Sequence, residues 1–176
     1  MPFTLPKQIQ DAFIKTAIVD QATLDRRFES NLNTIIHCTY VQPDTKKLLA
    51  AVVKMRKLSL AKHVKSMLFM ADAHQSGNIS FISLDFPSAQ RLYLEALNIG
   101  IDESQIAGKV YYKLYVLYNY MDQVETAMVF LHEAARLLYS EAMFQLSKLE
   151  KHPDLSHKLR MKAAKMHHEN AICDAF

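Results

Sequence analysis

The sequence has 176 residues, of which half are hydrophobic and 22% are charged, with a formal net charge of +3. This length suffices for one globular domain with a buried core, and the composition excludes an intrinsically disordered chain. The three glycines and five prolines are too few for the turns of a β-rich fold, and no two glycines have the spacing of a phosphate-binding loop. We therefore predict an all-α fold in a single domain, residues 1–176.

The charge is unevenly distributed along the chain. Residues 1–84 carry eleven Lys and Arg against six Asp and Glu, and the remainder carries ten against twelve. Cys38 and Cys173 have no metal-binding or redox spacing, which favours free thiols in a reducing compartment. The N-terminus lacks the pattern of a secretory signal, and no apolar run approaches the length of a membrane span. These features predict a cytoplasmic protein, or one delivered to a host cytosol without an N-terminal signal.

The N-terminal region, residues 1–84, is expected to form extra helices that can cap one end of the helical stack described below. A first helix is predicted to begin near Pro6, which suits a first helical turn. Either Asp20 or Thr23 can cap the second helix, because both side chains accept hydrogen bonds from free backbone N–H groups.

A basic helical pattern follows over residues 45–75, and Asp44 is its expected cap. The periodicity does not distinguish one long helix from two helices that break near residues 57–59. The β-like stretch 79–84 is predicted to be an extended connector rather than a strand, because it is short and isolated.

Helix boundaries are marked more clearly in the second region, residues 85–176. Asp85 is an expected N-cap, and Gly100 is an expected left-handed terminator. Asp122 and Glu125 have the spacing of a capping box, in which each side chain accepts from the backbone of the other residue. Ser140 is expected to cap the helix that follows it, and further helix starts are predicted at Asp102, Pro153 and Glu169.

Three short segments of this region resemble one another: residues 93–97, 131–135 and 161–164. Each places small or apolar residues in mid-helix, where another helix can approach closely. Such repetition predicts six to eight antiparallel helices, with the C-terminal ones stacked as hairpins in a short right-handed α-solenoid. We expect four alanines to lie buried at helix crossings: Ala134, Ala135, Ala163 and Ala164.

The junction from Ala134-Ala135 to Ser140-Glu-Ala-Met-Phe-Gln-Leu146 resembles Sel1-like repeats, relatives of tetratricopeptide repeats, as does Ala163-Ala164 followed by Glu169-Asn-Ala171. The sequence departs from that family where Ser147 and Tyr115 replace its glycine, and the copies are irregularly spaced. The resemblance implies a non-catalytic protein-binding scaffold of a kind common in bacteria. The resemblance suggests an adaptor or chaperone-like module, and such a module can serve in bacterial secretion or together with effector proteins.

A cluster of tyrosines is the candidate partner-binding surface. One helix cannot bury all of them, and rigid amphipathic rings are favoured contact residues. The alternative is that the rings pack between repeats. The predicted groove residues, which would hold a peptide or helix of another protein, are Tyr111, Tyr112, Tyr115 and Tyr118.

A basic helix is the alternative functional surface, because several cations there meet Asp44 alone as a nearby acid. Such a surface can contact the phosphates of nucleic acid or of an anionic membrane. The ordinary interpretation is a solvated helix face, since no aromatic residues alternate with the cations to stack on bases. The residues are Lys46, Lys47, Lys54, Arg56, Lys57, Lys62 and Lys65.

No pattern in the sequence indicates catalysis, a metal or a cofactor. His167 and His168 are adjacent and diverge on a helix, as do His37 and Cys38. We therefore predict a protein that is not an enzyme and has neither metal site nor cofactor. A homodimer through the C-terminal end is a further expectation, because residues 170–176 still carry apolar side chains.

Overall fold

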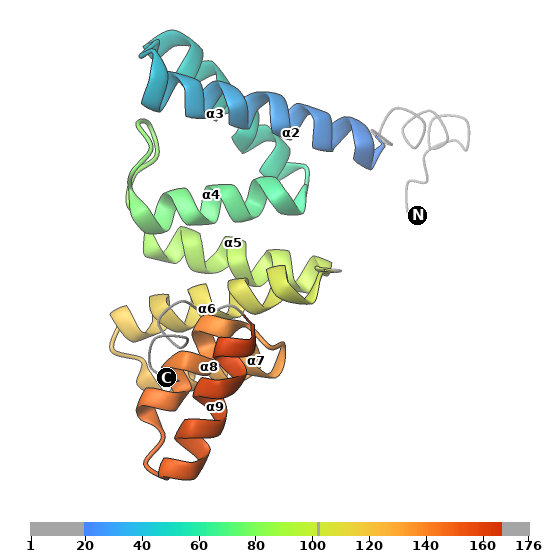
Figure 1. The fold of residues 1–176 in the computed structure, drawn as a ribbon. Helices are drawn as coiled ribbons and strands as arrows, with labels where there is room; N and C mark the ends of the chain where they lie inside the picture. The colour runs from blue at the N-terminus through green and yellow to red at the C-terminus, as the bar shows by residue number, and fades with distance from the viewer. Residues whose placement is uncertain (1–19, 102, 167–176) are drawn as a thin grey trace, which may run out of the picture. The chain divides into compact units, whose positions relative to one another are not determined.

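A computed structural model describes residues 20–101 and 103–166, and throughout these ranges the protein is all-α, as predicted. The stretch 79–84 contains no strand, as predicted, but it is not extended throughout. The N–H of Ile82 bonds to the carbonyl of Ile79 in a turn where Phe81 has a φ of 70°. The helix near Pro6, the starts at Asp102 and Glu169 and the C-terminal segment expected to self-associate lie outside the described residues. In chain order the elements (Figure 1) are α2 (Gln21–Ile36), the π-helical turn η1 (His37–Val41), α3 (Thr45–Leu60), α4 (Val64–Ser76), α5 (Phe86–Ile99), α6 (Ser104–Tyr120), α7 (Val124–Arg136), α8 (Ser140–Leu149) and α9 (Pro153–Lys165).

The chain divides into two compact units, residues 1–66 and 67–176. The division falls within α4, whereas the sequence suggested a change from N-terminal helices to repeats at residue 85. The expectations of a single domain and of a right-handed solenoid stay predictions.

Three helices begin at aspartates that were expected as caps. Asp20, Asp44 and Asp85 each accept a hydrogen bond from the backbone N–H three residues further on, at 2.6, 3.0 and 3.1 Å. Asp20, rather than Thr23, is therefore the cap of α2. Hydrogen bonds from that third residue hold the pKa of each carboxyl below its ordinary value, because they favour the charged form.

Three helix ends share one turn geometry, centred on Lys62, Asp122 and Leu138. Their φ angles are 63°, 57° and 60°, in the left-handed region that usually requires glycine. In each turn this residue's N–H bonds to the carbonyl three residues back, and the next N–H bonds to the carbonyl five residues back. This is the Schellman closure of a helix. Each time the next helix starts two residues after the left-handed one.

These turns settle one open question and correct two expectations. The basic pattern over 45–75 is two helices, because the first turn separates α3 from α4. The capping box at Asp122 does not form: Gln123 is the N-cap of α7, without a side-chain hydrogen bond, since Asp122 occupies the preceding turn. Ser140 is the first residue of α8, and its N-cap is Tyr139.

A further small correction concerns the end of α5. Gly100 has a positive φ of 110°, but its ψ of 134° lies outside the left-handed helical region. Its N–H still bonds to the carbonyl of Ala96. The glycine therefore ends the helix with an extended exit rather than with the expected left-handed cap.

In the first unit, α2 packs along α3, and η1 packs against both. The apolar faces meet because buried residues recur every three or four positions on each helix. The buried residues of this core include Phe28, Ile35, Val52, Met55 and Leu58.

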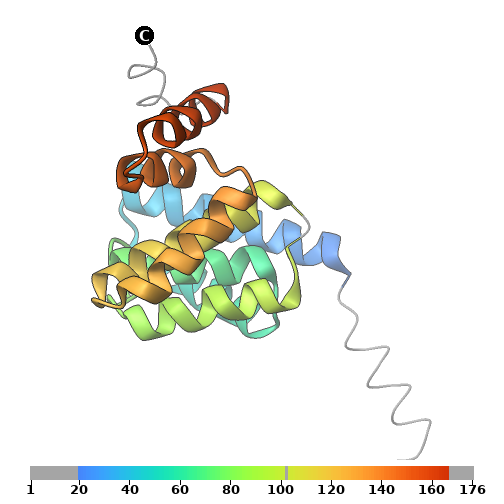
Figure 2. The ribbon, with the colours of Figure 1, turned by 90° about the horizontal axis from the view of Figure 1, so that it is seen from below.

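In the second unit each helix packs against the next one along the chain, from α5 to α9 (Figure 1 and Figure 2). Ala134 and Ala163 are fully buried, and Ala135 and Ala164 are partly buried against the same clusters, as the alanine pattern predicted. A Cβ atom on Gly108 would lie 3.0 Å from the Cβ of Tyr139. The glycine therefore permits the close approach of α6 to the turn after α7.

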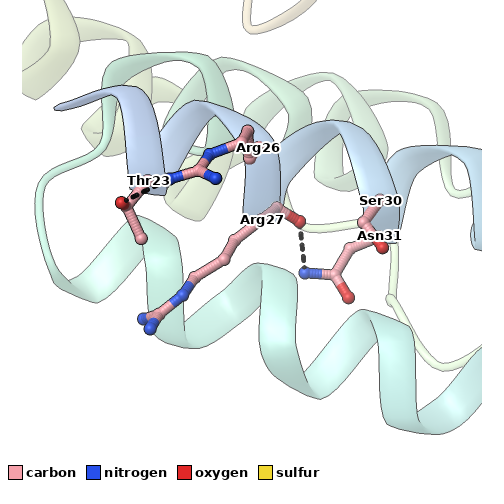
Figure 3. A pocket seen from close by; sticks show the side chains of 5 residues that line it. All are labelled: Thr23, Arg26, Arg27, Ser30 and Asn31. Atoms are coloured by element: carbon pink, nitrogen blue, oxygen red, sulfur yellow. Dashed lines mark hydrogen bonds between the residues drawn. The ribbon is translucent and has the colours of Figure 1, made fainter. Parts of the chain in front are cut away.

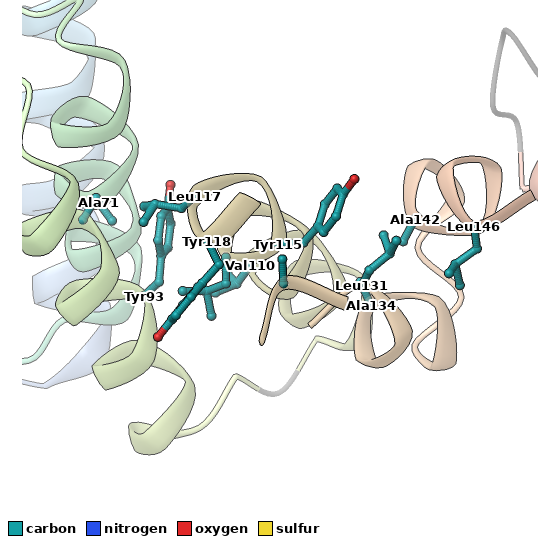
Figure 4. Packing of buried hydrophobic residues seen from close by; sticks show 13 residues of the cluster. Ala71, Tyr93, Val110, Tyr115, Leu117, Tyr118, Leu131, Ala134, Ala142 and Leu146 are labelled. Carbon is teal, nitrogen blue, oxygen red and sulfur yellow. The ribbon is translucent and has the colours of Figure 1, made fainter. Parts of the chain in front are cut away.

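Figure 4 shows the centre of this core, where Leu131 and Ala134 of α7 face Ala142 and Leu146 of α8. Small residues alternate there with large ones, which lets the two helices approach closely. The alanine pairs thus have a packing role at the crossing of consecutive helices.

Candidate functional site

Two of the predicted tyrosines are core residues of the second unit. Tyr115 and Tyr118 are each only 9% exposed. The Tyr118 hydroxyl accepts a hydrogen bond from Gln90 on α5, and the Tyr115 hydroxyl accepts one from Gln145 on α8 at 3.3 Å. Of the two interpretations, packing between helices therefore applies to Tyr115 and Tyr118, because their rings and hydroxyls are both occupied within the unit.

The other two predicted tyrosines are half-buried. Tyr111 stacks on Phe130 of α7, with ring centroids 6.2 Å apart. Tyr112 contacts Tyr115 and Tyr139 at 5.6 and 5.5 Å, and burial raises the pKa of its phenol. Both rings are partly accessible to solvent, so contact of Tyr111 and Tyr112 with a partner protein stays a prediction.

A groove opens where α7, α8 and α9 meet. Its volume is about 450 Å³, within the range of sites that take up small ligands or side chains. Apolar side chains form much of the lining, including Leu149, which is 48% exposed. The lining residues are Met128, His132, Leu146, Leu149, Glu150, Lys151, His152 and Leu159.

The groove combines apolar and titratable groups at its rim. His132 lies on α7 and His152 is the N-cap of α9, and both side chains are exposed. The backbone N–H of His152 bonds to Glu150 at 3.0 Å, which fixes the loop between α8 and α9. This site was not predicted from the sequence, because its residues come from three helices and no local pattern connects them.

The seven predicted cations of the first unit are all exposed. Lys62 lies in the turn after α3 and Lys65 lies on α4, so the seven do not belong to one continuous helix. Lys47 lies 3.3 Å from a carboxylate oxygen of Asp44, and Lys65 lies 2.9 Å from one of Asp25. The remaining cations of α3, at positions 46, 54, 56 and 57, spread over its solvent-facing half.

A buried polar chain in the first unit was also not predicted. His63 Nδ1 lies 2.7 Å from the Ser66 hydroxyl oxygen, and His63 Nε2 lies 3.2 Å from an Asp25 carboxylate oxygen. The pKa of Asp25 is lowered, first by the hydrogen bond from Lys65 and then by that from His63.

This Asp–His–Ser chain resembles a nucleophilic triad in composition only. His63 is 1% exposed and Ser66 is fully buried, so no substrate atom reaches the hydroxyl. The Ser66 backbone N–H also donates to His63 Nδ1 at 3.3 Å, which leaves Nε2 as the donor to Asp25. The chain therefore ties α2 to the turn between α3 and α4, and its role is structural.

A second polar cluster joins three helices of the second unit. The Tyr93 hydroxyl lies within hydrogen-bond distance of Asp72 and Gln75 on α4, and Lys113 on α6 pairs with Asp72 at 3.4 Å. Burial raises the pKa of Tyr93, and the neighbouring Asp72 raises it further. The cluster orients α5 against its neighbours, because Tyr93 is 1% exposed.

Within residues 20–101 and 103–166, no group of three His, Cys, Asp or Glu side chains is arranged to hold a metal ion. No helix in the same ranges is both long enough and apolar enough to cross a membrane.

Neither a protein-family model nor a curated protein matches the sequence. A solved structure, Pseudomonas aeruginosa 5086 (PA5086), aligns with 15% sequence identity and a TM-score of 0.44. The alignment covers 84% of this chain and 67% of the other.

Proposed function

We propose that the protein is a non-catalytic scaffold, an adaptor or chaperone-like module that binds a peptide or helix of another protein. The observation that carries this proposal is the apolar groove between α7, α8 and α9. Leu149 is exposed there, and the partly buried Met128 and Leu159 add apolar surface that a partner can cover. Helix-in-groove binding is a common mode of peptide recognition. The groove, rather than the tyrosines of α6, makes the main contact with the partner. Tyr111 and Tyr112 are further contact residues.

The sequence supports an intracellular setting for such a scaffold. Cys38 and Cys173 have neither metal-binding nor redox spacing, which favours a reducing cytosol, either of the producing cell or of a host after delivery. A second copy of the chain is also proposed as a partner, on the evidence of apolar residues in the segment 170–176.

The test is an affinity purification with the full chain as bait, repeated at low and at moderate salt. The groove variant Leu149→Asp has a control in Val129→Asp, because both side chains are exposed, at 48% and 60%, and Val129 lies outside the groove. A partner protein that survives moderate salt and is lost only with Leu149→Asp supports the proposal. Equal recovery with both variants contradicts it.

The second candidate is a basic protein that binds nucleic acid or anionic membrane. The observation in its favour is the charge of residues 20–66, which carry nine Lys and Arg against four Asp and Glu. Binding through several phosphate contacts loses orders of magnitude in affinity between low and moderate salt. Titration with an oligonucleotide and with phosphatidylserine vesicles at two salt concentrations therefore separates this candidate from the scaffold.

A further inference from the structure

A second groove lies in the first unit, between α2 and α3, and has a volume of about 460 Å³. Its lining residues recur at positions i, i+3, i+4 and i+7, so they form one face of each helix along two turns. The groove is therefore about 10 Å long. The residues are Leu24, Arg27 and Asn31 of α2, with Lys54, Lys57 and Leu58 of α3 and Ala61 just after it.

The lining combines an apolar floor with cationic walls. Leu24, Leu58 and Ala61 supply the apolar surface, and Arg27, Lys54 and Lys57 supply three positive charges. Figure 3 shows that Arg27 extends away from α2 beside Asn31, whose side-chain amide donates to the Arg27 carbonyl at 2.7 Å. The surface continues into a shallow hollow on α2 that includes Arg26.

The positive charge of this groove is not neutralised by the described residues of the unit. Asp25 pairs with His63 and Lys65, and Asp44 pairs with Lys47. Glu29 lies two positions from Arg27, about 200° around the helix, and so faces away from the groove. None of these carboxylates pairs with Arg27, Lys54 or Lys57, so the charge is available to a ligand.

We propose that this groove binds an acidic amphipathic helix of a partner protein, with leucine-type side chains on the floor and Asp or Glu against Arg27, Lys54 and Lys57. The occupant follows from the complementary chemistry of floor and walls, and a two-turn groove fits two turns of a helix. A flat membrane does not enter a concave groove. Nucleic acid has no apolar side chains for the floor, and no aromatic residue lines the groove to stack on bases.

This groove is separate from the one between α7, α8 and α9, so the two proposals can fail independently. The probe is a displayed library of helical peptides with randomised surface positions, selected against the full-length protein. We expect enriched peptides to carry apolar residues at helical spacing, flanked by Asp and Glu. The same peptides are then titrated against variants, alongside phosphatidylserine vesicles and a single-stranded oligonucleotide.

Two variants of the groove and one control define the outcome. Lys54→Glu with Lys57→Glu reverses the wall charge, and Ala61→Gln fills the exposed end of the floor. Each should weaken peptide binding at least about tenfold, since like charges across an interface repel and a filled groove excludes the helix. The control, Lys46→Glu with Lys47→Glu, changes the same net charge on α3 outside the groove and should keep most of the affinity.

Circular dichroism and the unfolding transition of each variant verify that the total helix content and the fold are retained, so a loss of binding is assigned to the groove. Selection of neutral or unpatterned peptides overturns the proposal, as does no enrichment. Equal loss with the control variant also overturns it, because the effect is then one of net charge. If the groove variants weaken only vesicle or oligonucleotide binding, the occupant is a phosphate surface and the acidic helix is wrong.

Discussion

The two units hold their helices together with different kinds of side chain. Four of the five buried polar residues in the described ranges lie in the first unit: Asn31, Ser59, His63 and Ser66. The second unit has only Ser147 in this class. Its polar cluster at Tyr93 joins α4, α5 and α6, whereas fully buried alanines such as Ala134 and Ala163 make the crossings of α7, α8 and α9. Packing by small residues depends on shape, whereas the buried polar chain depends on every partner being present.

The difference has a consequence for mutation. Removing one member of a buried polar chain leaves another member without its hydrogen bond, in addition to any cavity. Enlarging an alanine forces the two helices apart, and the cost is strain. The stability of the first unit should therefore fall most when a buried polar side chain is removed. The stability of the second unit should fall most when a buried alanine is replaced by a larger residue.

The largest effect is expected from His63→Ala in the first unit. The substitution empties a fully buried site beside Phe28, whose ring centroid lies 5.5 Å away, and removes the hydrogen bonds to Asp25 and Ser66. We expect a loss of about 3 kcal/mol in the free energy of unfolding, measured by denaturant titration. His157→Ala, at an exposed position on α9, is the control and should change stability by less than about 0.5 kcal/mol. Equal effects from the two substitutions would show that the polar chain contributes nothing.

Overpacking of the second unit should have a somewhat smaller effect. Ala134→Leu adds a branched side chain at a site with no exposed surface between α7 and α8. We expect a loss of about 1–3 kcal/mol in the free energy of unfolding. Val129→Leu, at a 60% exposed site on the same helix, should be nearly neutral. A cost of only a few tenths for Ala134→Leu would contradict the close approach of the two helices.

The Schellman turn occurs in both units. Replacing its left-handed residue by glycine should raise the stability of the protein. Leu138 has a φ of 60° and a half-exposed side chain, so glycine relieves the steric cost of the left-handed conformation. We expect Leu138→Gly to stabilise the protein by about 0.5–1 kcal/mol, measured by thermal or denaturant unfolding. Asp122→Gly should give a smaller gain, because aspartate tolerates this conformation better than leucine does. Destabilisation by Leu138→Gly would contradict the positive φ.

The smallest effect is an alkaline transition that belongs to the second unit. Burial is the main cause that raises the pKa of Tyr93 and Tyr112, and it raises the pKa of Tyr139 to about 12. A folded-state pKa above the unfolded value of 10.0 means that these phenols stabilise the fold fully below pH 10. For Tyr139 this contribution falls as the pH rises toward 12.

Ultraviolet titration of phenolate absorbance measures this transition. A fraction of the tyrosines should ionise only near pH 12 or with unfolding, and Tyr139→Phe should reduce that late fraction. Complete ionisation of all tyrosines near pH 10 in the folded protein would mean that these rings are solvated.

The sequence by itself determined the helical class and many local features. Scarce glycine excluded β-rich folds, and aspartates before apolar periodicity located the starts of α2, α3 and α5. The repeated alanine pairs located the crossings of the second unit, because residue size at helical spacing is written directly in the sequence. These features depend on neighbours within one or two turns of the same chain segment.

Other features were decided only by tertiary structure. The Schellman turns at Lys62 and Leu138 use non-glycine residues in a left-handed conformation, which propensity disfavours and which the packing of the next helix enforces. The contact between Asp25 and His63 joins residues 38 positions apart. The tyrosines of α6 could be placed on a helix, but whether a ring packs or binds depends on which neighbouring helix covers it. Both grooves arise in the same way, since each is formed by faces of different helices whose residues meet only after the chain has folded.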